Sequence, residues 1–225
     1  MQHCRGFSEG NGRVPLPNAL RAQVGGKVDL WYFQSPKNRR RFVLCGELLF
    51  LLAITLESDR HIVSYEPYEF DDEDGLAATD RPHLRALDVT GKQIDYITIR
   101  TRNPRKATKP LLKQRDLNGV TIITDEWLYD RRVLLDNWIF LCAALNRVRH
   151  SPWQLEAAAM HDLLQLAGNC TLDSLLALPN IDRARMLGAV ADALQRGTAN
   201  CDTCKSLFSL SSQIFPGGPS WHIHA

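Results

Sequence analysis

The alternation of apolar and polar positions along the first two thirds of the chain predicts a mixed order of helices and strands. A long apolar stretch with only one acid predicts a buried helix, and β-branched and aromatic residues at alternate positions predict strands. The predicted elements are a helix at 43–56, strands at 62–70, 84–89 and 94–101, a short helix at 109–118, a strand at 120–124 and a helix at 125–149. This order predicts a mixed sheet flanked by helices.

The remainder of the chain predicts three helices and a β-like tail. Ser151 is expected to cap the first helix, with Pro152 at its first position and Gly168 at its end. The three helices are expected at 151–168, 171–179 and 180–197, and the tail at 199–215. Three helices followed by a hairpin are typical of a winged helix-turn-helix. The chain is therefore divided into an arm at 1–26, an α/β domain at 27–149 and a winged-helix domain at 150–225.

Composition places the chain among ordinary globular proteins. It has 225 residues, of which 44% are hydrophobic and 23% charged. We find neither an apolar run long enough to span a bilayer nor the apolar core of a secretion signal in the first residues. We therefore expect no membrane contact and a cytoplasmic location, where the six cysteines would stay reduced.

Charge is distributed unevenly along the sequence. Seven Lys and Arg residues and no acid lie between residues 96 and 115, whereas seven acids and no Lys or Arg lie between 66 and 80. Clustered bases mark the footprint of a nucleic acid, so we expect DNA contacts from this run and from the basic triplet at 39–41. The predicted DNA-binding residues are Arg39, Arg40, Arg41, Arg102, Arg105, Lys106, Lys109 and Lys113.

Several stretches, in order, resemble a known family. They are "SPKNRRRFVLCGELLFLL", "ESDRHIVSYEPYEF", "GVTIITDEWLYDRRVLLDN" and the terminal "CDTCKSLFSLSSQI". Together they resemble TnsA, the endonuclease subunit of heteromeric cut-and-paste transposases. The resemblance implies a restriction-endonuclease-like fold with a C-terminal winged helix. It also implies cutting of the 5′ strands at transposon ends with Mg²⁺ or Mn²⁺, beside an integrase-type transposase subunit and an ATP-dependent regulator.

The resemblance implies a catalytic set of Asp88, Glu47, Thr98 and Arg100, with Asp88 as the metal ligand. Thr98-Ile99-Arg100 stands where the family has Glu or Gln, any residue, and Lys. A threonine offers only a neutral hydroxyl, and an arginine stays protonated and cannot act as a base. The family's helix glutamate corresponds to position 49 or 50, about two residues beyond Glu47, which is roughly 200° around a helix. Two hypotheses follow: a metal-dependent endonuclease, and a non-catalytic DNA-binding and assembly subunit.

Two features of the C-terminal part leave alternatives open. The third helix carries Arg183, Arg185 and Arg196, which suit contacts with DNA or with a protein partner. Cys201 and Cys204 form a C-x-x-C pair, but zinc needs four ligands. The further candidates are Cys170, His222 and His224. We interpret the pair as two ordinary cysteines of the wing.

Overall fold

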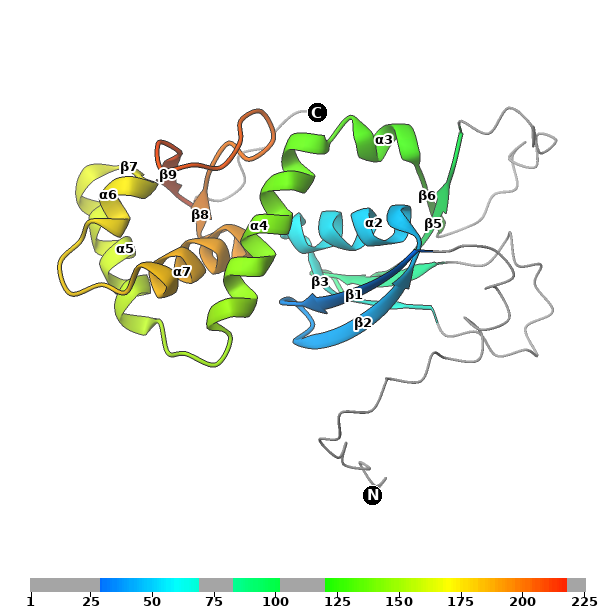
Figure 1. Ribbon diagram of the computed structural model, residues 1–225, viewed down its shortest axis with the longest axis horizontal. Coiled ribbons are helices and arrows are strands. Elements are labelled where there is room, and N and C mark those ends of the chain that lie inside the picture. The colour runs from blue at the N-terminus through cyan, green and yellow to red at the C-terminus, as the bar shows by residue number, and fades with distance from the viewer. Residues whose placement is uncertain (1–28, 69–82, 102–119, 218–225) are drawn as a thin grey trace, which may run out of the picture.

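The computed structural model describes residues 29–68, 83–101 and 120–217, which form a mixed α/β structure (Figure 1). The predicted short helix at 109–118 lies outside these ranges. The prediction of a mixed sheet flanked by helices is confirmed. Within the described ranges, no helix has both the length and the apolar character needed to cross a membrane.

A hairpin that the apolar pattern did not predict opens the described chain. β1 (Leu30–Ser35) pairs antiparallel with β2 (Arg40–Cys45). Phe33 on β1 and Phe42 and Leu44 on β2 are buried, so one face of the hairpin belongs to the core. This is the period-two burial of strands that pack on one side only.

The apolar helix starts later than predicted. α2 runs from Glu47 to Ser58, because the residues around Val43 belong to β2. Gly46 separates the two elements with a φ of 87°, a left-handed value that glycine adopts without steric cost. The prediction of a helix beginning at residue 43 is therefore wrong. A short run of apolar residues does not by itself distinguish a buried strand from a helix.

A four-stranded sheet lies beside α2, in the order β3-β4-β5-β6. The first two pairings are antiparallel and the last is parallel. Leu84 and Tyr96 face each other across β4 and β5, and both are buried in the core that contains α2. The strands are β3 (Ile62–Pro67), β4 (Leu84–Asp88), β5 (Gln93–Ile99) and β6 (Val120–Thr124).

The predicted helix at 125–149 is in fact two helices, α3 (Asp125–Tyr129) and α4 (Arg132–Val148). At the break, the side chain of Arg131 contacts Trp127 of α3. Its Nη1 donates to the Trp127 carbonyl at 3.1 Å, and its guanidinium lies 3.7 Å from the centre of the Trp127 ring. The backbone N–H of Arg131 instead donates to the Leu128 carbonyl, one residue short of α-helical spacing.

Residues 154–217 form what we call the C-terminal module. Its three short strands pair in the order β7-β9-β8, and its helices pack around them. The elements are α5 (Gln154–Ala167), β7 (Cys170–Thr171), α6 (Leu172–Leu176), α7 (Arg183–Arg196), β8 (Ala199–Asn200) and β9 (Gln213–Pro216).

The predicted helix ends in this module are partly confirmed. Gly168 and Gly197 end α5 and α7 with φ values of 74° and 73°, as expected of C-terminal glycines. The predicted start of the first helix is wrong, since Trp153 precedes α5 and no side chain caps it. Ser151 and Pro152 belong to the turn after α4.

α7 joins the C-terminal module to the rest of the molecule by packing against α4 (Figure 1). Ala191 of α7 lies in the core that contains α2 and the sheet, while Val190 lies in the core of the C-terminal module. Gly188 permits the close approach: a Cβ at this position would lie 2.3 Å from Cγ2 of Val148. The two helices therefore meet through small residues, and their cores are continuous.

A buried amide ties the loop before β9 to α4 as well. The Asn137 Nδ2 donates to the carbonyls of Thr203 and Ser206, both at 2.8 Å, and its Oδ1 accepts from the Phe208 N–H at 2.7 Å. Asn137 is 3% exposed, so these three bonds replace hydration that the amide has lost.

We predict that Gly188→Ala lowers the free energy of unfolding by about 1–3 kcal/mol, because overpacking at α4 outweighs the helix propensity of alanine. Urea denaturation of the variant measures the change. Val148→Ala added to Gly188→Ala removes the colliding methyl and should recover part of the loss. An unchanged or raised stability of Gly188→Ala would contradict the packing described above.

Candidate functional site

Asp88, the predicted metal ligand, lies at the turn of the β4–β5 hairpin. Its carboxylate accepts hydrogen bonds from the Thr90 N–H, the Thr90 hydroxyl and the Lys92 N–H, at 2.8, 2.6 and 2.8 Å. These bonds, the Thr90 hydroxyl first among them, lower the pKa of Asp88. The carboxylate has the bonding of a turn aspartate that shapes the local backbone.

The structure does not bring Asp88 together with the other predicted catalytic residues of the hairpin. The strands are antiparallel, so Asp88 lies beside Lys92 at one end of β5, and Thr98 lies near the other end. At roughly 3.3 Å per residue, this separation along the strand is about 20 Å. Asp88 and the Thr98-x-Arg100 triplet cannot share one metal ion at that distance.

His83 occupies the position on the β4 side that faces Thr98. Its Nδ1 accepts from the Thr98 N–H at 3.1 Å and lies 2.9 Å from the Thr98 hydroxyl oxygen. Burial lowers the pKa of His83, which favours a neutral ring, and the hydrogen bond from the Thr98 N–H requires that Nδ1 is unprotonated. Sequence reasoning missed this residue, although its place just before the strand was a usable signal.

Glu47 and Arg100 both lie close to Tyr129 of α3. The Tyr129 hydroxyl donates to Glu47 Oε2 at 3.2 Å. The pKa of Tyr129 is raised by burial and by the charge of Glu47, and the charge of Arg100 opposes that rise. The start of α2 and the end of β5 therefore both lie beside α3. Glu47 is the one acid of the predicted set at this end.

These side chains do not fit a divalent metal ion. Magnesium binding in proteins relies on carboxylate oxygens that are free to bind it, and the carboxylates near Tyr129 are those of Glu47 and Asp125. Asp125 already accepts from the N–H and the hydroxyl of Thr101, at 2.9 and 2.6 Å, and the remaining groups are a hydroxyl, an imidazole and a guanidinium. Throughout residues 29–68, 83–101 and 120–217, no cluster of three or more His, Cys, Asp or Glu side chains is placed to hold a metal. The arrangement suits hydrogen bonding and anion contact instead.

The basic triplet does not form one surface. Arg40 is exposed and lies 3.6 Å from the Glu66 carboxylate, and its guanidinium lies 5.4 Å from the Phe42 ring centre. Arg41 is exposed on β2, opposite Gln34. Arg39 sits in the hairpin turn with a φ of 54°. The other predicted DNA-binding residues, Arg102, Arg105, Lys106, Lys109 and Lys113, lie outside the described residues.

The two cysteines of the C-x-x-C pair differ in their surroundings. Cys201 is half-buried, and burial, followed by the nearby charge of Asp202, raises the pKa of its thiol to about 11. Cys204 is exposed. His222 and His224 lie outside the described residues.

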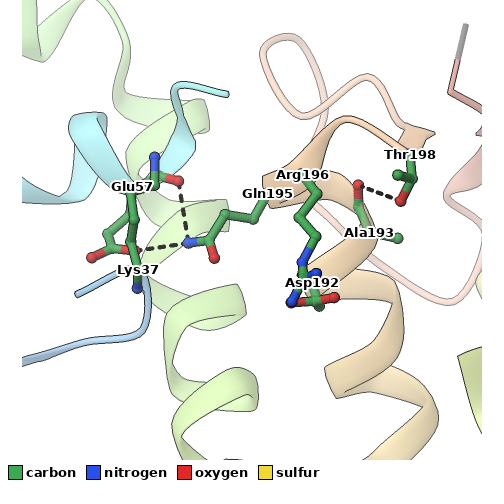
Figure 2. Close-up of polar contacts among 7 residues, drawn as sticks. All are labelled: Lys37, Glu57, Asp192, Ala193, Gln195, Arg196 and Thr198. Atoms are coloured by element: carbon green, nitrogen blue, oxygen red, sulfur yellow. Dashed lines mark hydrogen bonds and ion pairs between the residues drawn. The ribbon is translucent and has the colours of Figure 1, made fainter. Parts of the chain in front are cut away.

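A buried carboxylate that sequence reasoning missed lies at the centre of the molecule. Glu57, at the end of α2, is fully buried. Its Oε1 accepts from the hydroxyls of Ser35 and, at 2.6 Å, of Tyr65. Its Oε2 accepts from the Lys37 N–H at 3.1 Å and from Gln195 Nε2 at 2.7 Å. Figure 2 shows Gln195 reaching from α7 to this carboxylate and to the Glu57 carbonyl.

Lys37 completes this network from the turn of the β1–β2 hairpin. Its Nζ donates to the carbonyls of Leu56 and Asp59 at 2.6 and 2.7 Å, at the end of α2 where helix carbonyls lack intrahelical partners. Burial lowers the pKa of Lys37 to about 8, and the charges of Glu57 and Asp59 only partly offset this effect. Burial likewise raises the pKa of Glu57, and the hydrogen bonds that its carboxylate accepts oppose this rise.

Comparison of the chain with protein-family models, curated proteins and solved structures finds no match.

We predict that neither the wild type nor Asp88→Ala gives a Mn²⁺-binding heat in calorimetry. His83→Asp combined with Thr98→Glu should create a Mn²⁺-binding heat, because two carboxylates would then meet where His83 and Thr98 now bond. A wild-type heat that disappears in Asp88→Ala would contradict this placement of the residues.

We also predict a pH dependence of stability from Lys37. A lysine whose pKa is lower in the folded state favours folding above its unfolded pKa, near 10.5, and loses that contribution as the pH falls to about 8. The unfolding free energy of the wild type, relative to Lys37→Met, should therefore rise between pH 8 and 10.5. Urea denaturation at several pH values gives the difference, and a flat difference would contradict the burial of this amine.

Proposed function

We propose that the protein is a non-cleaving, DNA-binding subunit of a TnsA-type transposition complex. The proposal rests on the side chains that lie at the end of β5, where the resemblance places the catalytic residues Thr98 and Arg100. His83, Thr98 and Arg100 stand there with two carboxylates, and the predicted ligand Asp88 lies at the far end of the hairpin. Glu47 accepts from the Tyr129 hydroxyl, and Asp125 accepts from the N–H and the hydroxyl of Thr101. An arginine and hydrogen-bonding side chains suit contact with a phosphate, whereas metal-dependent hydrolysis needs acids that are free to bind the ion.

The arrangement of the elements supports the resemblance on which this proposal rests. A helix, three antiparallel strands and a parallel fourth strand follow in order as α2, β3, β4, β5 and β6. This is the order expected of a restriction-endonuclease-like core. The C-terminal module has helix, strand, two helices and a final strand pair, the order expected of a winged helix.

The packing of α7 bears on how such a protein would contact DNA. In helix-turn-helix proteins the recognition helix enters the major groove with one face free. α7 instead packs on α4 through Gly188 and contributes Ala191 to the central core. We therefore propose that DNA contacts come from exposed bases outside α7, namely Arg100 at the end of β5 and Arg40 and Arg41 of the hairpin. The C-terminal module positions the subunit and meets partner proteins.

The test combines duplex binding with a nicking assay on the same preparation. We predict that the protein binds duplex DNA at low salt and leaves a supercoiled plasmid intact with Mg²⁺ or Mn²⁺. Arg40→Glu with Arg41→Glu should weaken binding about tenfold or more, as expected when phosphate contacts are lost. The control, Arg132→Glu with Arg147→Glu, makes the same charge change on α4.

Metal-dependent nicking that Glu47→Gln abolishes would contradict the proposal and favour an active endonuclease. Failure to bind duplex DNA at low salt would contradict the DNA-binding part. An equal loss of DNA affinity in the two double variants would show that the affinity depends on net charge and not on the hairpin arginines.

A further inference from the structure

A basic cleft separates the turn of the β1–β2 hairpin from α4 and α7. Its volume is about 780 Å³. Five cations line it against a single carboxylate, that of Asp192. The cations are Lys37, Arg39, Arg60, Arg149 and Arg196. Charges of one sign in a concave surface reinforce each other, because the low-dielectric walls focus their field.

Most of this charge is available to a ligand. Arg196 is paired with Asp192 at 3.0 Å, within α7, and Figure 2 shows it turned toward that residue. Among the described residues, no carboxylate forms an ion pair with Arg39, Arg60 or Arg149. A cleft with several uncompensated guanidinium groups is an anion site, and guanidinium matches the geometry of phosphate.

The buried network described above holds the floor of the cleft in place. Lys37 and Gln195 both line the cleft, and both bond to Glu57. The Lys37 amine is itself bonded to two carbonyls, so its charge is fixed at the floor. Groups that are already ordered lose little conformational entropy when they bind a ligand.

An aromatic side chain adds a second kind of contact. Trp153, at the start of α5, is half-buried and lines the same cleft, next to His150. Aromatic faces beside a basic groove are the usual platform for the bases of single-stranded nucleic acids, which stack without regard to sequence. A cleft of this volume is the size of a small-ligand site, so it suits a few nucleotides of one strand and not a duplex.

We propose that this basic cleft binds a single-stranded nucleic-acid segment, with its phosphates on Arg39, Arg60 and Arg149 and a base against Trp153. The inference deepens the proposed DNA-binding function by giving it a separate site for an unpaired strand. Such a strand exists wherever duplex ends are frayed or cut with an overhang. An acidic peptide would use the cations but gain nothing from the tryptophan, so the observations favour the nucleic acid.

The test measures binding of a fluorescein-labelled oligothymidylate by fluorescence anisotropy. Arg39→Glu with Arg149→Glu should weaken binding about tenfold or more, and should reduce the slope of log affinity against log salt by about 1.4, as expected when two single-strand phosphate contacts are lost. The control, Arg132→Glu with Arg147→Glu, carries the same charge change outside the cleft and should bind as the wild type does. Arg149→Gln alone, a smaller change, should give a smaller loss in the same direction even if the double variant fails to fold.

Trp153 gives an independent readout. Tryptophan fluorescence should be quenched by the oligothymidylate in the wild type, and the quenching should be largely lost in Trp153→Phe. Pyrophosphate and polyglutamate serve as competitors. Competition by either as effective as that of the oligonucleotide would overturn the proposal and show a general anion or acidic-peptide site.

Equal binding by the cleft variant and its control would also overturn the inference. The proposed function is judged separately, by duplex binding. Loss of single-strand binding with duplex binding intact, in the cleft variant, supports the inference. Single-strand binding in the cleft with no duplex binding by the wild type would reject the proposed function alone.

Discussion

The buried carboxylate of Glu57 is the interaction on which the rest of the structure depends. It accepts hydrogen bonds from four different residues: Ser35 and Lys37 of the hairpin, Tyr65 of β3 and Gln195 of α7. Burying a carboxylate is costly unless its oxygens are satisfied, so these four partners must be in place together. One side chain therefore fixes the hairpin, the sheet and the C-terminal module relative to α2.

The same network explains why a basic cleft persists between the parts. Like charges around a concave surface repel each other, and the molecule needs compensating interactions to keep them close. Here the hairpin turn and the end of α7 are each bonded to Glu57, and the small residues of α7 pack against α4. The cleft cannot relax without breaking buried hydrogen bonds.

Much of the fold could be predicted from the sequence, because period-two and helical patterns reflect burial directly. The strands at 62–70, 84–89, 94–101 and 120–124 and the helices of the C-terminal part are all found, with shifted ends. The hairpin of β1 and β2 was not predicted, since strand β2 and helix α2 are both apolar and only Gly46 separates them. The break between α3 and α4 lies where Arg131 contacts Trp127, and the apolar pattern of the sequence does not indicate it.

The candidate site was predictable only in part. Glu47 and Arg100 both lie close to Tyr129, and the antiparallel strand register places Asp88 at the other end of the hairpin from Thr98. Counting residues along one strand does not tell which residues of the neighbouring strand lie beside them. His83 and Glu57 were missed because their importance comes from partners far away in sequence: Thr98 for the first, Ser35 and Gln195 for the second.

Urea denaturation of Glu57→Ala, compared with Glu66→Ala, tests the central claim most directly. Glu66 is an exposed acid of β3 whose one ion pair is at the surface, so its loss should change the unfolding free energy by less than about 0.5 kcal/mol. Glu57→Ala leaves several buried donors without an acceptor, and should lower the unfolding free energy by about 3 kcal/mol or more. A cost for Glu57→Ala as small as that for Glu66→Ala would contradict the account.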